Sequence, residues 1–129
     1  MRIKVERAED QASVFSVSGE LDAYTAPDLR DALDAELAEG KSWVIVDMAG
    51  LSYLDSTGLG ILVGTAKKCR QVNGDLAVAC TKPNLLKIFE ISGTTEILNV
   101  VESVEAAMER LEELASSRAA DEGEQEGGR

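Results

Sequence analysis

Residues 43–80 constrain the fold of this chain more than any other segment, because an apolar run, a helical pattern and a second apolar run follow one another there. Residues 43–48 are apolar apart from Asp47, which is typical of a strand covered on both faces. Residues 57–71 carry apolar side chains at helical spacing, and residues 76–80 form the next apolar run. This order predicts a βαβ unit, in which two parallel strands are joined by a right-handed crossover.

The segment between the first strand and the helix is the candidate site. A polar loop is predicted over residues 49–55, at the carboxyl end of a strand, where open α/β sheets place their functional sites. The loop leads to Ser56, which we expect at the helix N-cap, where its hydroxyl would stabilise the helix by roughly 1 kcal/mol. The same free N–H groups and the helix dipole would also accommodate a phosphate. The residues by themselves leave both interpretations open.

The N-terminal segments fit an α/β protein. Apolar residues alternate with polar ones at 3–5 and again at 14–17, so we expect two antiparallel strands joined by a polar turn at 7–11. Thr25 is expected to cap a helix over about residues 26–39, because Pro and Asp follow at favourable positions.

The C-terminal half repeats this pattern. Thr81 begins a second Thr-x-Pro helix opening, Gly93 would end that helix, and a short strand is expected at 97–101. Ser103 would then cap a last helix, in which apolar residues recur with a 3.6-residue period over 104–114. Core packing explains this stripe, and a coiled coil that binds a partner is the alternative.

The chain has the length of one domain, with 129 residues of which 44% are hydrophobic. We expect this domain over residues 1–115, with a mixed sheet of four to five strands and about four helices. Its first two strands would be antiparallel and the later ones parallel. Residues 116–129 hold no large apolar side chain, so we expect a disordered acidic tail. A docking arm is the alternative role for that tail.

Composition excludes several functions. The net charge of −11 argues against binding nucleic acid or an anionic membrane. The chain has no histidine, which removes the common hydrolase triads and the usual zinc sites. Phosphate-binding glycine loops are also missing. We therefore expect no enzymatic activity and no cofactor, and we expect a cytoplasmic location because no signal peptide or membrane-spanning run is present.

Cys69 and Cys80 lie in apolar contexts, one on a predicted helix and one on a predicted strand. Buried free thiols are therefore favoured over a redox pair.

A partner-binding surface is a candidate near Ser56. Ile61 would lie on the helix face opposite the core stripe, beside glycines, although a single exposed Ile is ordinary in any protein. The candidates on this face are Thr57, Ile61, Gly64 and Lys68. Three more lie at a strand-to-helix junction that is expected at the same end of the sheet: Asp22, Tyr24 and Thr25.

Three blocks of sequence resemble the anti-sigma factor antagonists, the free-standing STAS domains of bacterial partner-switching systems. The blocks are residues 19–27 (Gly-Glu-Leu-Asp-Ala-Tyr-Thr-Ala-Pro), residues 44–60, and residues 86–93 (Leu-Lys-Ile-Phe-Glu-Ile-Ser-Gly). The middle block is the most specific, because it contains Asp-Ser-Thr-Gly-Leu-Gly at 55–60. The resemblance covers about residues 1–114.

The resemblance implies a regulatory binding protein. In this family the unphosphorylated form binds an anti-sigma factor that is itself an ATP-dependent serine kinase, and so releases the sigma factor. The kinase would phosphorylate Ser56 and switch binding off, and a PP2C-type phosphatase would restore it. Asp22 and Asp55 match acidic family positions near the switch, and Gly58 belongs to the same block as Asp55. We therefore expect Asp55 and Gly58 to contact the partner as well. The chain would be a monomer or weak dimer, and a stressosome-type or other scaffolding STAS domain is the alternative.

Elementary electrostatics agrees with this scheme. A phosphoserine adds about −1.5 to −2 charges and three acceptor oxygens, which a helix N-terminus tolerates. The neighbouring Asp55 carboxylate would repel the phosphate, and a partner surface shaped for a neutral hydroxyl would not accommodate it. We therefore predict a switch that excludes the partner by charge and bulk, with little refolding.

Overall fold

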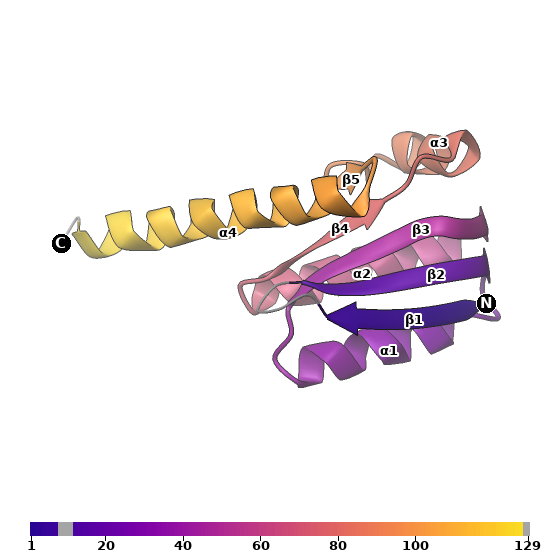
Figure 1. Cartoon of the computed structure of the whole chain (residues 1–129), viewed down its shortest axis with the longest axis horizontal. Helices are drawn as coiled ribbons and strands as arrows, with labels where there is room; N and C mark the ends of the chain where they lie inside the picture. The colour runs from indigo at the N-terminus through magenta and orange to yellow at the C-terminus, as the bar shows by residue number, and fades with distance from the viewer. Residues whose placement is uncertain (8–11, 128–129) are drawn as a thin grey trace.

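The computed structural model describes residues 1–7 and 12–127, with side chains described as far as residue 120. Nine elements follow one another along the described chain (Figure 1). They are β1 (Arg2–Arg7), β2 (Ser13–Leu21), α1 (Ala26–Ala38), β3 (Trp43–Leu54), α2 (Ser56–Gln71), β4 (Asp75–Ala79), α3 (Pro83–Ser92), β5 (Val100–Val101) and α4 (Val104–Gly127). Most of the turn expected at 7–11 lies outside the described residues.

The five strands form one mixed sheet in the order β1-β2-β3-β4-β5. β1 runs antiparallel to β2, and the remaining neighbours pair in parallel. The predicted βαβ unit is present as β3, α2 and β4. This arrangement confirms the α/β fold with an antiparallel opening pair that the hydrophobic patterns predict.

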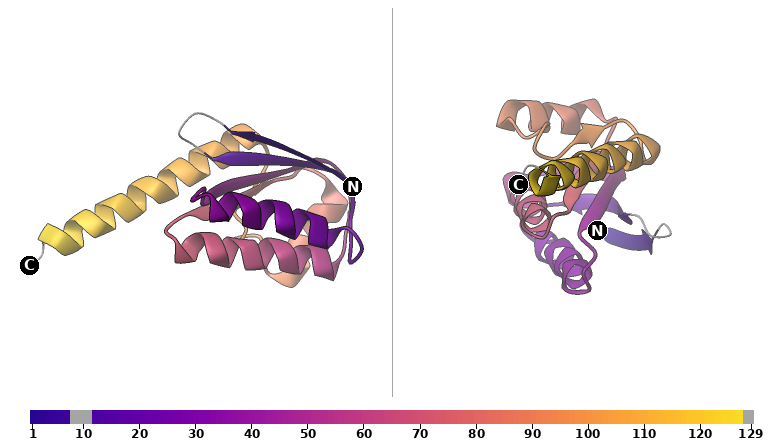
Figure 2. Two further views of the ribbon diagram at one scale, coloured as in Figure 1. Left: turned by 90° about the horizontal axis from the view of Figure 1, so that it is seen from below. Right: turned by 90° about the vertical axis from the view of Figure 1, so that its left-hand side faces the viewer.

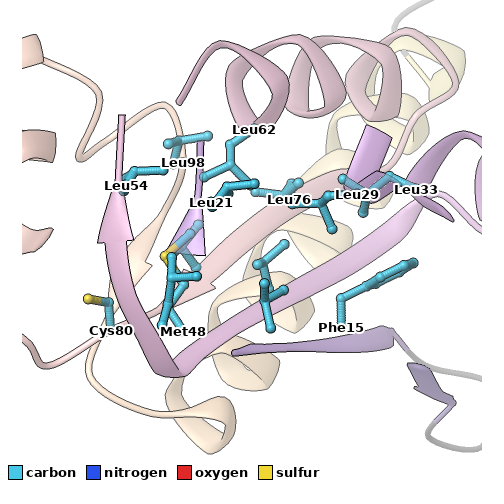
Figure 3. Close-up of a cluster of buried hydrophobic side chains, with 14 of the residues drawn as sticks. Phe15, Leu21, Leu29, Leu33, Met48, Leu54, Leu62, Leu76, Cys80 and Leu98 are labelled. Carbon is cyan, nitrogen blue, oxygen red and sulfur yellow. The ribbon is translucent and has the colours of Figure 1, made fainter. Parts of the chain in front are cut away.

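Helices cover both faces of the sheet. α1 and α2 lie side by side on one face and α4 lies on the other (Figure 2). Leucines of α1 and α2 interdigitate with Phe15 of β2 and Leu76 of β4 in the larger core (Figure 3). A smaller core lies under α4, where Ala107 and Leu111 pack on Ile45 of β3. The apolar stripe at the start of α4 is therefore core packing, as the first interpretation held.

β3 is longer than its apolar run, so the loop predicted over 49–55 is wrong. β2 continues to Leu21 and pairs in parallel with β3 as far as Leu54, which gives the polar part of β3 a backbone partner. The ladder shifts register between Ser16 and Ser18 and again after Gly19, so the extension is irregular. Backbone pairing across the sheet extends this strand beyond what its side chains indicate.

The C-terminal helix also departs from expectation. Disorder was expected from residue 116, yet α4 continues to Gly127 and extends past the end of the sheet (Figure 1). The helix is anchored beyond residue 115 by Arg118, whose guanidinium Nη2 donates to Asp75 Oδ2 at 2.7 Å. The boundary at 115 is therefore not an end of secondary structure, while residues 128–129 lie outside the described part.

Smaller differences concern helix caps and the last strand. α3 begins at Pro83 with Lys82 as its N-cap rather than Thr81, and it ends at Gly93, whose left-handed backbone (φ 70°) matches the predicted stop. β5 is confined to Val100–Val101, because the residues before it form a hydrogen-bonded turn. Ser103 caps α4 as predicted, its hydroxyl accepting a hydrogen bond from Ala106 N at 3.0 Å.

Candidate functional site

Ser56 is the first residue of α2 and is not its N-cap. The cap is Asp55, which has an extended backbone and whose Oδ1 accepts a hydrogen bond from Gly58 N at 3.0 Å. The capping prediction was wrong by one residue, because Asp and Ser are equally good caps. Within the described part of the chain the exposed Ser56 side chain makes no hydrogen bond. Its hydroxyl is therefore available to another molecule.

Asp55 also joins α2 to the turn between β2 and α1. Its Oδ2 accepts a hydrogen bond from Ala23 N at 3.1 Å, and its own N–H donates to Leu21 O at 3.1 Å. The two strand-to-helix junctions therefore meet at one edge of the sheet, as expected for the carboxyl ends of neighbouring parallel strands.

The turn at residues 22–25 is held by its own polar side chains. Asp22 Oδ1 accepts hydrogen bonds from Tyr24 N at 2.9 Å and Thr25 N at 3.0 Å, and these bonds, led by the one from Thr25, lower the pKa of Asp22. Thr25 is the N-cap residue of α1, as predicted, but its hydroxyl donates to Glu20 O at 2.8 Å and makes no capping hydrogen bond. The side chain of Tyr24, in the same turn, is 94% exposed. The turn therefore presents one aromatic side chain and uses its polar ones internally.

Gly58 is inside the protein. A Cβ at this position would lie 2.6 Å from Leu21 Cγ and 2.9 Å from Leu54 Cδ1. Glycine is therefore needed for α2 to start close to β2 and β3. The expectation that Gly58 contacts a partner does not fit this burial, whereas its neighbour Thr57 is exposed.

Two other expected surface residues take part in intramolecular packing. Ile61 is half-buried and packs against the core. Lys68 Nζ lies 2.9 Å from Asp34 Oδ1 of α1, and both side chains are partly exposed. Thr65, which lies between them on the helix, is buried. This side of α2 faces the rest of the protein. The exposed face of α2 therefore lies at a different angle around the helix axis from the predicted one.

The free face of α2 starts at Ser56 and follows positions spaced four, four and three residues apart. Its residues are Ser56, Gly60, Gly64 and Lys67. A methyl group on Gly60 or Gly64 would meet no atom within 4 Å beyond the adjoining helix backbone. A glycine inside a helix costs about 1 kcal/mol relative to alanine, and nothing in the described fold makes use of these two. Sequence reasoning missed Gly60 and Lys67, although their spacing from Ser56 was a usable signal.

Neither a metal centre nor a membrane span is found in the described part of the chain. No group of three or more His, Cys, Asp or Glu side chains there could hold a metal ion. The helices of residues 1–7 and 12–127 include none with the length and apolar character that crossing a bilayer requires.

Comparison with known proteins decides the family. Residues 3–107 match the model of the STAS domain. The chain belongs to the STAS domain family. This STAS domain is 38% identical over 103 residues to the anti-sigma-B factor antagonist of Listeria monocytogenes, covering 80% of this chain and 89% of that protein. It is 34% identical over 106 residues to the anti-sigma-B factor antagonist of Staphylococcus aureus, covering 81% of this chain and 98% of that protein.

A solved structure supports the same assignment. The crystal structure of an anti-sigma factor antagonist from Mycobacterium paratuberculosis superimposes with a TM-score of 0.78 at 27% identity, covering 86% of this chain and 93% of that one. The resemblance of the three sequence blocks to this family is thereby confirmed.

Proposed function

We propose that this STAS domain is an anti-sigma factor antagonist whose binding is switched by phosphorylation of Ser56. The unphosphorylated form binds an anti-sigma factor that is an ATP-dependent serine kinase, in the cytoplasm, and thereby releases a sigma factor. Phosphate on Ser56 ends this binding, and a PP2C-type phosphatase restores it. The observation that carries the proposal is the exposed Ser56 hydroxyl, which Asp55 leaves unoccupied by capping α2 in its place.

The position suits a reversible phosphate. Ser56 lies in the first turn of α2, where the positive end of the helix dipole favours an anion. The hydroxyl is not part of the cap, so its modification leaves the hydrogen bond from Gly58 N to Asp55 in place. The folded protein therefore tolerates the phosphate, and the switch needs little refolding.

The surface around Ser56 suits a protein partner. Tyr24 offers an exposed aromatic side chain of the type enriched at the energetic centres of interfaces. Gly60 and Gly64 present bare helix backbone, which a partner could approach closely. A phosphate of about −1.5 to −2 charges beside this surface would have to be desolvated in the complex, so it would exclude a partner surface shaped for a neutral hydroxyl.

The test combines the full chain with ATP and the anti-sigma-B factor of Listeria monocytogenes, followed by intact-mass measurement and peptide mapping. We expect one added phosphate on Ser56. Ser56→Ala should take up none, whereas Thr57→Ala, which removes the neighbouring exposed hydroxyl, should be modified like the unaltered chain.

Binding of the same anti-sigma-B factor gives the second readout. Ser56→Ala should bind within about twofold of the unaltered chain, and Ser56→Asp should bind at least about tenfold more weakly, since a buried unpaired charge costs more than 1.4 kcal/mol. Equal affinity of the two variants would contradict the switch.

A further inference from the structure

Asp55 was expected to contact the partner, yet both of its carboxylate oxygens are used inside the protein. Oδ1 accepts from Gly58 N at 3.0 Å, and Oδ2 accepts from Ala23 N at 3.1 Å. These two donors belong to different segments, the first turn of α2 and the turn that precedes α1. The Asp55 carboxylate thus links the start of α2 to a turn 32 residues earlier in the sequence.

The bridge fixes Tyr24 relative to Ser56. Tyr24 directly follows Ala23, and its side chain has almost no packing of its own, being 94% exposed. Backbone hydrogen bonds must therefore hold the main chain from which this side chain extends. Asp22 shapes the turn internally through Tyr24 N and Thr25 N, but these bonds do not connect the turn to α2. The bond from Ala23 N to Asp55 makes that connection beside the backbone bond from Asp55 N to Leu21 O.

We propose that Asp55 is a positioning residue for the partner surface: it holds the turn bearing Tyr24 against the start of α2, so that Tyr24 and Ser56 present one preformed surface. Preforming lowers the ordering cost of binding, which is the usual gain from rigid interface segments. The inference rests on the proposed function for the partner, whereas the clamp itself can be measured in the isolated chain.

Asp55→Asn separates the two bonds made by this side chain. Asn caps helices as well as Asp, but its carboxamide has a single acceptor oxygen. With that oxygen in the capping bond to Gly58 N, the bond from Ala23 N is lost. Asp55→Ser has the same consequence with a different side chain. Ser52→Ala is the matched control, because the Ser52 hydroxyl bonds Gly19 O on the same edge of the sheet without touching Ala23 or Gly58.

The first measurement is amide hydrogen exchange of the full chain by NMR. In Asp55→Asn and Asp55→Ser, exchange at Ala23 should accelerate about tenfold, the effect of losing one hydrogen bond to a charged group, while Gly58 should keep its protection. Ser52→Ala should leave both amides unchanged. Unchanged exchange at Ala23 in both Asp55 variants would overturn the clamp.

The second measurement is a double-mutant cycle with the Listeria monocytogenes anti-sigma-B factor as the probe. Asp55→Asn and Tyr24→Ala should each weaken binding about fivefold or more, and the double variant should bind no more weakly than the weaker single variant. Additive losses would overturn the assignment of Asp55 as a positioning residue. Absence of binding by the unaltered chain would contradict the proposed function, while the exchange experiment would still decide the clamp.

Discussion

The guanidinium of Arg118 lies over the indole ring of Trp43, 5.4 Å from the ring centroid, and donates to the carboxylate of Asp75 at 2.7 Å. It also donates to the carbonyl oxygen of Gly74. The Asp75 side chain is only 3% exposed and is shared with Arg70 at 2.9 Å. One side chain beyond the predicted domain boundary thus supplies a second guanidinium to a buried carboxylate.

Arg118→Ala should lower the free energy of unfolding by about 1–3 kcal/mol, because Oδ2 of the buried Asp75 carboxylate loses the hydrogen bond from Arg118 while Arg70 stays on Oδ1. Urea unfolding measures the change, and Trp43, the one tryptophan of the chain, reports it by fluorescence. A chain ending at residue 115 should match Arg118→Ala, and a chain ending at residue 120 should match the full chain. Equal stability of these two truncated chains would show that Arg118 does not anchor α4.

Gly60→Ala and Gly64→Ala should each raise the free energy of unfolding by about 1 kcal/mol, because alanine is the better helix former and the added methyl group meets open space. The same changes should weaken binding of the anti-sigma-B factor if the bare backbone is a contact surface. Gly58→Ala is the opposite control, since its methyl group would clash with Leu21 and cost about 1–3 kcal/mol. Stabilised variants with unaltered binding would place the partner elsewhere.

Glu36 should make the stability depend on pH in the acidic range. Hydrogen bonds from Arg7, and then from Ser13, favour its carboxylate and lower the pKa of Glu36 in the folded state. The resulting stabilisation is present above the ordinary glutamate pKa and is lost as the pH falls through the lower, folded-state pKa. Urea unfolding between pH 7 and pH 3 should therefore show a weaker pH dependence in Glu36→Gln than in Glu112→Gln, an exposed control. The same pH dependence of the free energy of unfolding in both variants would argue against this role of Glu36.

Cys69 and Cys80 should be unreactive in the folded protein. Both are buried free thiols, and burial raises the pKa of Cys69 to about 12 and also raises the pKa of Cys80. Because the thiolate is the reactive form, a disulfide reagent at pH 8 should modify them only as fast as the protein opens. The absorbance of the product that the reagent releases should rise slowly in the absence of urea and at once in its presence. Rapid reaction of the native chain would favour a redox role instead.

The order of elements could be predicted from local patterns, because each pattern depends on residues close in sequence. The 3.6-residue period predicted α2 and the start of α4, and the two apolar runs predicted β3 and β4. The Asp55–Gly60 block and its two companions pointed to the family that comparison confirmed. These features could be predicted because helix periodicity and strand burial depend on side chains that are close in sequence.

The details of the site could not be predicted in the same way. Asp55 and Ser56 are equally suited to cap a helix, and the backbone entering α2 from β3 selected Asp55. The free face of α2 was misplaced because Ile61 packs against the core and Lys68 pairs with Asp34 of α1, and only contacts between distant segments set that angle. A composition without large apolar residues concealed the anchor at Arg118, whose partners lie more than 40 residues earlier in the chain.

The sequence by itself thus determined the βαβ frame, the family and the position of Ser56 at the start of a helix, since these follow from local periodicity and contiguous motifs. Tertiary structure decided that Asp55 caps the helix and bridges to Ala23, that Gly60 and Gly64 face outward, and that α4 continues past residue 115. The bridge to Ala23, the outward face of α2 and the anchoring of α4 past residue 115 depend on hydrogen bonds or packing contacts between segments that meet only when the sheet has formed.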